Sequence, residues 1–233
     1  MVNKMPAFSV AAYVSFLEQL VQGGTTLLPV THMADAKSAP KTVFLRHDVD
    51  FSLQLSLPMA MAEAERGIKA TYYVLLNGPY SLEDGVEMDS LKRLVALDHE
   101  IGLHYDLKNY PDDLGDQEKK LCAEVAQLET LIGRSINTIT MHEPHRTSGD
   151  PFREKQWIHP HHPELFSTVR YVSDSCRAWR DESLLDALHA EEDRLLLLTH
   201  PELWLDDGVK DRYQYLEETL VPRMTEESLP YFR

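Results

Sequence analysis

Strand-like and helix-like segments alternate along most of this chain, and that order limits the folds open to it. Several short runs are apolar and rich in β-branched or aromatic residues, which is typical of strands. Between most of them lies a longer segment with apolar residues at helical spacing. Consecutive strands separated by a helix are normally parallel, because the chain must cross over before it pairs again in the same direction. The predicted strands are residues 43–50, 70–76, 100–106, 138–142, 171–175 and 195–200.

The predicted helices begin and end at recognisable residues. In the first, apolar residues recur at helical spacing from Val10 to Val21, with Ser9 as a suitable N-terminal cap and Gly23–Gly24 as the stop. This pattern predicts an α/β fold of mostly parallel strands with an extra N-terminal helix, and either a barrel or an open doubly wound sheet satisfies it. The other predicted helices are residues 53–66, 88–97, 116–132, 182–189 and 212–220.

Composition narrows the class of protein. The 233 residues are 43% apolar and 26% charged, which is typical of a folded globular chain, and no repeat or linker divides them, so we expect one domain over residues 1–233. The net charge of −15 argues against a nucleic-acid partner, because phosphates require a basic face. Cys122 and Cys176 lie far apart in the sequence, which argues against a disulfide framework. No apolar run is long enough to span a membrane. We therefore expect a cytoplasmic protein.

The ends of the predicted strands carry acidic and histidine residues. Asp48 and Asp50 lie two residues apart on one strand, so their side chains share a face with Arg46. Two carboxylates that close repel each other unless a proton or a cation lies between them. A divalent metal would remove that conflict, and mixed imidazole and carboxylate ligands suit zinc, with iron, cobalt or nickel as alternatives. The strand-end residues are Asp48, Asp50, His104, His142, Asp174 and His200.

The carboxyl ends of parallel strands meet at one edge, where α/β proteins place their active sites. The strand-end residues therefore predict a metal-dependent hydrolytic site. A competing metal candidate is the cluster His159, His161 and His162, which lies in a Pro-rich segment, and we favour its interpretation as a solvated lid without a ligand. Of the remaining histidines, we leave His47 and His145 open and expect surface or satisfied core positions for His32, His99 and His189.

Five ordered segments carry a resemblance to a known family. They read RHDVD, EIGLHYD, MHEPHR, YVSDS and LLLTHPELW, and they extend from about Val43 to Trp204. In order and approximate spacing they resemble the polysaccharide deacetylase family (NodB-homology, carbohydrate esterase family four), most of all its HDVD-bearing branch linked to bacterial surface-polysaccharide and O-antigen (lipopolysaccharide) biosynthesis. The resemblance implies a distorted (β/α)7 barrel, one divalent metal, usually zinc, and hydrolytic removal of acetyl from an N-acetylated sugar.

The resemblance also implies roles for individual residues. Asp48 resembles the family's catalytic base, and Asp50 its metal-ligating carboxylate. His104 looks like the first histidine of a ligand pair, and His200 like the general acid. Asp174 falls in the motif whose polar groups orient the base or the acid. The implied reaction uses metal-activated water, with an Asp base and a His acid.

Two positions depart from the family pattern. The second histidine of the ligand pair is replaced by Lys108, and the place of an arginine in the third motif is taken by His142. We hypothesise that His142 supplies the missing ligand, so that the metal set is Asp50, His104 and His142. Arg146 or Arg177 could then take the arginine's role beside Asp48, and the sequence does not choose between them.

Other functions stay open at this stage. Lys108 leaves room for a deacetylase-like domain that has lost catalysis and only binds a sugar or a protein. A D-x-D after an apolar strand also resembles a Mg²⁺-dependent aspartyl-nucleophile phosphatase, for which the chain offers the late acidic pair Asp206 and Asp207. The expected substrate of the favoured reaction is an N-acetylated sugar, whether free, nucleotide-linked, lipid-linked or polymeric.

Overall fold

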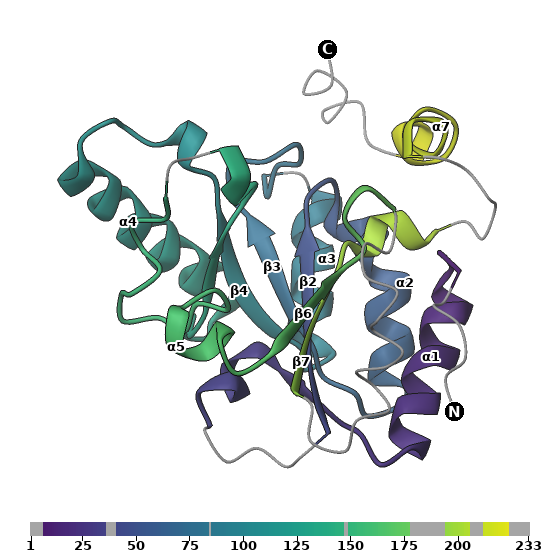
Figure 1. The fold of residues 1–233 in the computed structure, drawn as a ribbon. Helices are drawn as coiled ribbons and strands as arrows, with labels where there is room; N and C mark the ends of the chain where they lie inside the picture. Colours follow the sequence, from purple (N-terminus) through teal and green to yellow (C-terminus); the bar gives the residue numbers. More distant parts are fainter. Residues whose placement is uncertain are drawn as a thin grey trace.

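The structure is a computed structural model that describes residues 7–35, 41–83, 85–146, 149–177, 194–205 and 212–223. Seven strands form one parallel sheet in the order β5-β4-β3-β2-β7-β6, with β1 paired to the first half of β2 (Figure 1). The strands are β1 (Thr26–Pro29), β2 (Thr42–Val49), β3 (Thr71–Leu75), β4 (Glu100–Tyr105), β5 (Ile139–Met141), β6 (Arg170–Ser173) and β7 (Arg194–Thr199).

The sheet curls, and a segment of the chain fills the space between its two end strands. Ile158 pairs in parallel beside β5, accepting a hydrogen bond from the Ile139 amide at 3.1 Å and donating one to Asn137 at 3.0 Å. Three residues later, the ring of His161 lies edge-on against Tyr171 of β6, with 5.6 Å between centroids. The fold is therefore the distorted (β/α) barrel that the family resemblance implies, and not an open doubly wound sheet.

Helices cover the outer face of the sheet. Helix α1 packs on α2, α2 on α3, and α3 on α4, so that neighbouring helices follow chain order (Figure 1). The Ser9 hydroxyl caps α1 by accepting the Ala12 amide, and Gly133 ends α4 in the left-handed conformation that glycine adopts without strain. None of the helices in the described residues is long and apolar enough to cross a membrane. The helices are α1 (Val10–Gln22), α2 (Leu53–Ala64), α3 (Gly85–Ala96), α4 (Leu114–Ile132), α5 (Pro163–Phe166) and α7 (Arg212–Tyr215).

The inner face of the barrel is apolar in one half and polar in the other. Along β2 the inward positions are Phe44, then Arg46, then Asp48, because side chains alternate across a strand. Gly102 of β4 also faces inward, where a Cβ atom would lie 2.5 Å from the ring of Tyr73. Only glycine allows this approach without moving the ring. The apolar half is formed by Val30, Met33, Phe44, Tyr73 and Leu196.

On the outer face of β2, a buried carboxylate joins α1, α2 and three strands. Glu63 accepts hydrogen bonds from the hydroxyls of Tyr13 at 2.6 Å and Tyr72 at 2.7 Å, and its Oε1 lies 2.9 Å from Nε2 of His47. The other ring nitrogen of His47 lies 2.6 Å from the Thr199 hydroxyl. Burial opposes ionisation of Glu63, but His47 outweighs it and holds the pKa of this carboxyl below its usual range. His47 is thus part of the core.

Most predicted elements are confirmed, with strand ends that differ by at most two residues. The exceptions are informative. Strand β1 was not predicted, since four residues ending in Pro29 carry little strand signal. The predicted helix 212–220 begins as α7 and continues as a π-helical turn from Leu216 to Leu220. The predicted helix 182–189 lies outside the described residues.

We expect Glu63→Ala to lower the free energy of unfolding by about 3 kcal/mol or more, because it leaves buried hydroxyl and imidazole donors without their acceptor. Urea unfolding followed by circular dichroism measures the change. The control is Glu65→Ala two residues on, where the side chain is 70% exposed, and it should shift the free energy by less than about 0.5 kcal/mol. Equal effects of the two variants would contradict a stabilising role for the Glu63 network.

Candidate active site

The carboxyl ends of five strands place acidic and histidine side chains around one space. Asp48 is near the end of β2 and Asp50 follows it, while His104 is near the end of β4. The others lie directly after their strands: His142 after β5, Asp174 after β6 and His200 after β7. Because all these strands are parallel, their ends meet at the same edge of the barrel. The six strand-end residues predicted from the sequence are therefore brought together.

Asp50, His104 and His142 form a compact group of possible metal ligands. One atom from each lies within 4.8 Å of the other two. Oδ1 of Asp50 is 3.4 Å from Nε2 of His104 and 3.3 Å from Nδ1 of His142, and the two imidazole nitrogens are 3.3 Å apart. The described residues contain no other such group of histidine, cysteine and acidic side chains. This arrangement is of the size that a single cation can occupy.

The hydrogen bonds around the group fit a cation. Nδ1 of His104 lies 3.0 Å from the carbonyl oxygen of Thr140, which can only accept, so Nδ1 carries the proton. In the neutral ring the lone pair of Nε2 then faces Asp50. Oδ1 of Asp50 is buried and makes no hydrogen bond. Nε2 of His104 and Oδ1 of Asp50 are thus acceptors directed at one space, as in a site for a divalent metal with imidazole and carboxylate ligands.

The electrostatics of the group keep Asp50 ionised. Burial would raise its pKa, but the neighbouring imidazoles of His104, His142 and His200 outweigh burial and hold the pKa well below the usual range. Burial likewise disfavours the charged form of His142, yet Asp50 outweighs it and raises the pKa of this imidazole. Asp50 therefore favours positive charge in its immediate surroundings.

Asp48 is held by an arginine of its own strand. Nε and Nη2 of Arg46 each donate a hydrogen bond of 2.8 Å to one carboxylate oxygen, and Oδ2 lies 3.6 Å from Nε2 of His104. Burial would raise the pKa of Asp48, but Arg46 outweighs it and keeps the pKa below its usual range. Such paired hydrogen bonds are strong and fix the orientation of a carboxylate. Asp48 is therefore an oriented, ionised acceptor beside the possible metal ligands Asp50, His104 and His142.

His200 is paired with a fully buried carboxylate. Oδ1 of Asp174 lies 2.6 Å from Nδ1 of His200, and Oδ2 accepts hydrogen bonds from the His200 amide at 2.9 Å and from the indole of Trp204 at 2.7 Å. Burial disfavours the imidazolium, but Asp174 outweighs it and raises the pKa of His200 to about 10. Nε2, the other ring nitrogen, faces Asp50 at 3.6 Å. His200 therefore presents a protonated nitrogen to the site.

The two arginines expected beside Asp48 lie elsewhere. Arg146 is exposed and pairs with Glu143 at 2.8 Å. Nε of Arg177 donates to the Leu203 carbonyl, and its guanidinium lies 4.1 Å from the centre of the Tyr215 ring. The place beside Asp48 belongs to Arg46. The alternation of side chains along a strand places Arg46 and Asp48 on the same face. It does not predict their hydrogen bonds, because a shared face does not reveal the rotamer that turns the Arg46 guanidinium toward Asp48.

The histidine-rich segment is not a solvated lid. His159 is 1% exposed, and its Nε2 lies 3.0 Å from Oδ2 of Asp150. His161 is partly buried, and its Nε2 lies 3.2 Å from Nη1 of Arg46. The expectation was wrong because a Pro-rich segment without periodicity gives no sign that it pairs beside β5. His99 is a satisfied core histidine as expected, bonded to the Ala60 carbonyl at 2.9 Å.

One carboxylic acid at the site is not among the residues predicted from the sequence. Glu202 is fully buried, and its Oε1 accepts the amide of Phe51 at 2.7 Å. Burial raises the pKa of Glu202 to about 8, with Asp50 adding to the shift. Glu202 thus connects the turn after β7 to the turn that carries Asp50. Its position in HPELW, two residues after His200, was the only available hint.

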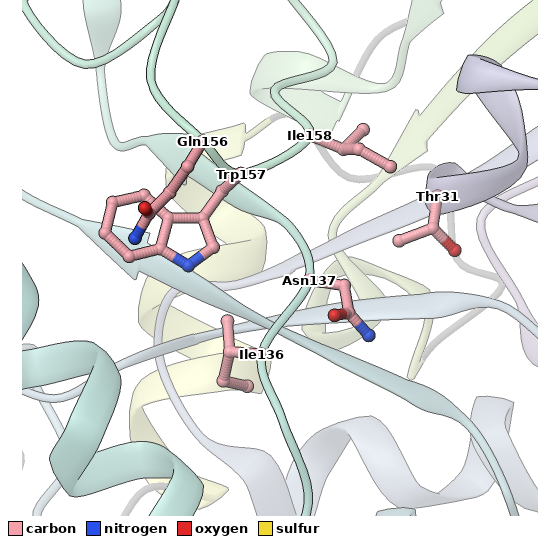
Figure 2. Close-up of a pocket in the computed structure, with 6 residues that line it drawn as sticks. All are labelled: Thr31, Ile136, Asn137, Gln156, Trp157 and Ile158. Atoms are coloured by element: carbon pink, nitrogen blue, oxygen red, sulfur yellow. The ribbon is translucent and has the colours of Figure 1, made fainter.

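A separate cavity lies away from these residues. It has a volume of about 530 Å³, and Figure 2 shows Trp157 and Gln156 on one side of it and Thr31 on the other. The Thr31 hydroxyl bonds to Glu100, the first residue of β4, so the cavity is near the amino ends of the strands. None of the six strand-end residues lines it. Its lining is Thr31, Ile136, Asn137, Gln156, Trp157 and Ile158.

Comparisons with known proteins find similarity at the level of structure. No family model and no curated protein matches the sequence of this chain. A mutant of a CE4-family (carbohydrate esterase family four) pseudoenzyme from Bacillus anthracis aligns with a TM-score of 0.50 and 16% identity, over 79% of this chain and 62% of that one. The Streptococcus pyogenes deacetylase PplD, solved in complex with acetate, aligns with a TM-score of 0.50 and 13% identity, over 86% of this chain and 87% of that one.

These similarities establish the fold. The chain shares its barrel with a protein described as a CE4-family pseudoenzyme and with one described as a deacetylase. It spans only 62% of the length of the first of these structures. At such low identity the residues of the site, and not the resemblance, must carry any conclusion about chemistry.

We predict that Asp174→Asn lowers the pKa of His200 from about 10 toward the ordinary imidazole value of about 6.5, because the substitution removes the negative charge next to Nδ1. NMR titration of the His200 ring in chelator-treated protein measures this value. Asp35→Asn, a change on the surface far from the site, should leave the His200 titration as it is. A His200 pKa that is the same in Asp174→Asn and wild type would disprove the assigned cause.

Proposed function

We propose that this chain is a metal-dependent hydrolase that removes an acetyl group from an N-acetylated sugar. The observation that carries the proposal is the convergence, at the carboxyl ends of five strands of one sheet, of a group of three possible metal ligands, an arginine-bound carboxylate and a carboxylate-bound imidazolium. Metal ligands, an ionised base and a protonated acid are the components that acyl hydrolysis requires. The resemblance of the five sequence motifs supports the same reaction.

Asp50, His104 and His142 would hold the metal. Zinc is the favoured ion, because two imidazoles and one carboxylate are a common ligand set of catalytic zinc and leave a position open, while iron, cobalt and nickel accept the same ligands. When bound, such a cation supplies Lewis acidity toward water and the acyl carbonyl. His142, which follows β5, would replace the ligand that the family pattern places at position 108, where this chain has Lys108.

The protein's own groups divide the proton transfers between them. Asp48, ionised and oriented by Arg46, would accept the proton of the attacking water. His200, protonated and held at Nδ1 by Asp174, would donate from Nε2 to the nitrogen of the leaving amine. The two groups have pKa values shifted in opposite directions by their partners, which is the usual sign of a base and an acid acting together.

The proposal includes a substrate class and a pathway. The substrate is an N-acetylated sugar or sugar derivative, and the pathway is the synthesis of a surface polysaccharide such as lipopolysaccharide O-antigen. This part rests on the resemblance of the RHDVD segment to the HDVD-bearing branch.

A second candidate function is binding without catalysis. The observation in its favour is Lys108 at the position of a family metal ligand; its ammonium pairs with Asp106 at 2.9 Å. A structural neighbour described as a pseudoenzyme has the same fold. If His142 does not replace the missing ligand, the site would bind a sugar without hydrolysing it.

Metal binding tests the ligand assignment. We expect His142→Ala to weaken zinc binding by about 100-fold or more, because it removes one of three protein ligands. Mutation of groups that only contact the ligands already lowers metal affinity by about 10- to 100-fold. Competition against a chromophoric chelator, together with metal analysis after dialysis, measures the effect. Lys108→Ala is the matched control and should bind zinc as the wild type does. Full zinc occupancy in His142→Ala would show that this residue is not a ligand.

Acetate release tests the reaction. Zinc-loaded protein should release acetate from at least one of N-acetylglucosamine, UDP-N-acetylglucosamine and tetra-N-acetylchitotetraose, and a chelator should stop it. Asp48→Asn should lower the rate by about 100- to 10,000-fold while zinc stays bound, because it removes the base and leaves all three ligands. Asp112→Asn, on the surface, should keep the wild-type rate. Binding of one of these sugars without acetate release would favour the second candidate function.

A further inference from the structure

We propose that His161 is a positioning residue of this site: it accepts a hydrogen bond from Arg46 and so fixes the guanidinium that orients Asp48. The effect of this contact on turnover rests on the proposed function, whereas the contact itself does not. His161 belongs to the segment between β5 and β6, and 115 residues separate it from Arg46.

The direction of the hydrogen bond follows from the chemistry of the two side chains. Nη1 of Arg46 lies 3.2 Å from Nε2 of His161. A guanidinium has N–H donors and no acceptor, so Nε2 of His161 must be the acceptor. The proton of the neutral imidazole is then on Nδ1. Burial together with the charge of Arg46 lowers the pKa of His161 to about 3, so the ring is neutral at pH 7 and able to accept.

Arg46 needs this partner because it is almost fully buried. Its side chain is 2% exposed, and Nε and Nη2 are occupied by Asp48. The Tyr73 ring lies on one side of the guanidinium, with 5.4 Å between Cζ and the ring centre, and offers no strong acceptor to Nη1. Without His161, a buried N–H of Arg46 would lose its acceptor, and this loss favours a rotation of the guanidinium away from Asp48.

His161 is itself held in place from the backbone side. Its amide donates to Nδ1 of His159 at 3.1 Å, which leaves the His159 proton on Nε2, directed at Asp150 at 3.0 Å. Asp150 also accepts the hydroxyl of Tyr105 at 2.5 Å. Tyr105 follows His104 in β4, so this chain of hydrogen bonds ties the segment to the strand that carries a metal ligand.

The ring of His161 is also packed. It lies edge-on against Phe166 at 5.1 Å and Tyr171 at 5.6 Å between ring centroids. A phenyl ring could make the same contacts but could not accept a hydrogen bond. A glutamine could accept at Oε1 but would lose the ring contacts. These two substitutions therefore separate packing from hydrogen bonding.

The experiment compares His161→Phe with His161→Gln in the zinc-loaded full chain. Acetate release is measured with whichever of the three N-acetylated sugars above turns over fastest. We expect His161→Phe to lower kcat about 10- to 100-fold with KM and zinc content unchanged, because Asp48 loses its orientation and the ligands do not. His161→Gln should restore kcat to within about threefold of the wild type. His162→Gln, at the adjacent position, should leave kcat unchanged.

A second measurement does not depend on turnover. Long-range ¹⁵N NMR at pH 7 should show His161 as the neutral tautomer with its proton on Nδ1, and Arg46→Met should abolish that preference. A proton on Nε2, or an imidazolium, would overturn the proposal, as would equal losses of kcat in the Phe and Gln variants. A wild type with the expected tautomer but no acetate release would contradict the proposed function alone.

Discussion

The rest of this site depends on the repulsion between two carboxylates that one strand end places in the same buried space. Asp48 and Asp50 both stay ionised, although burial opposes their charges, because positive charge surrounds each of them. Arg46 neutralises the first through two hydrogen bonds. His104 and His142 lie against the second, where a proton or a divalent cation completes the balance. At low local dielectric, neither carboxylate would stay ionised without these partners.

The inner face of β2 shows how the barrel supports such a concentration of charge. Phe44 lies among apolar side chains in one half of the interior, while Arg46 and Asp48 follow it on the same face in the polar half. Because side chains alternate along the strand, His47 lies on the opposite face, where it contacts the buried Glu63 carboxylate between the sheet and the helices. One strand therefore supplies both the chemistry of the site and a buried attachment for the surrounding helices.

The fold by itself leaves the activity open. The same barrel occurs in a protein described as a pseudoenzyme and in one described as a deacetylase, so activity must depend on individual side chains. For this chain we propose that the deciding side chains are His142, in the group with Asp50 and His104, and Arg46, beside Asp48. His142 directly follows β5 and Arg46 lies within β2, and neither is at the motif position where the family resemblance would seek its counterpart.

The sequence alone determined the order of strands and helices, because hydrophobic periodicity and helix caps are local properties of the chain. It also identified the six strand-end residues, since parallel strands must bring their carboxyl ends to one edge. Only the tertiary structure decided which side chains are hydrogen-bonded to each other: Arg46 to Asp48, Trp204 to Asp174, and His161 to Arg46. These contacts depend on rotamers and on a segment that pairs beside β5 from far along the chain. No local pattern encodes them, because the partners meet only when the barrel closes.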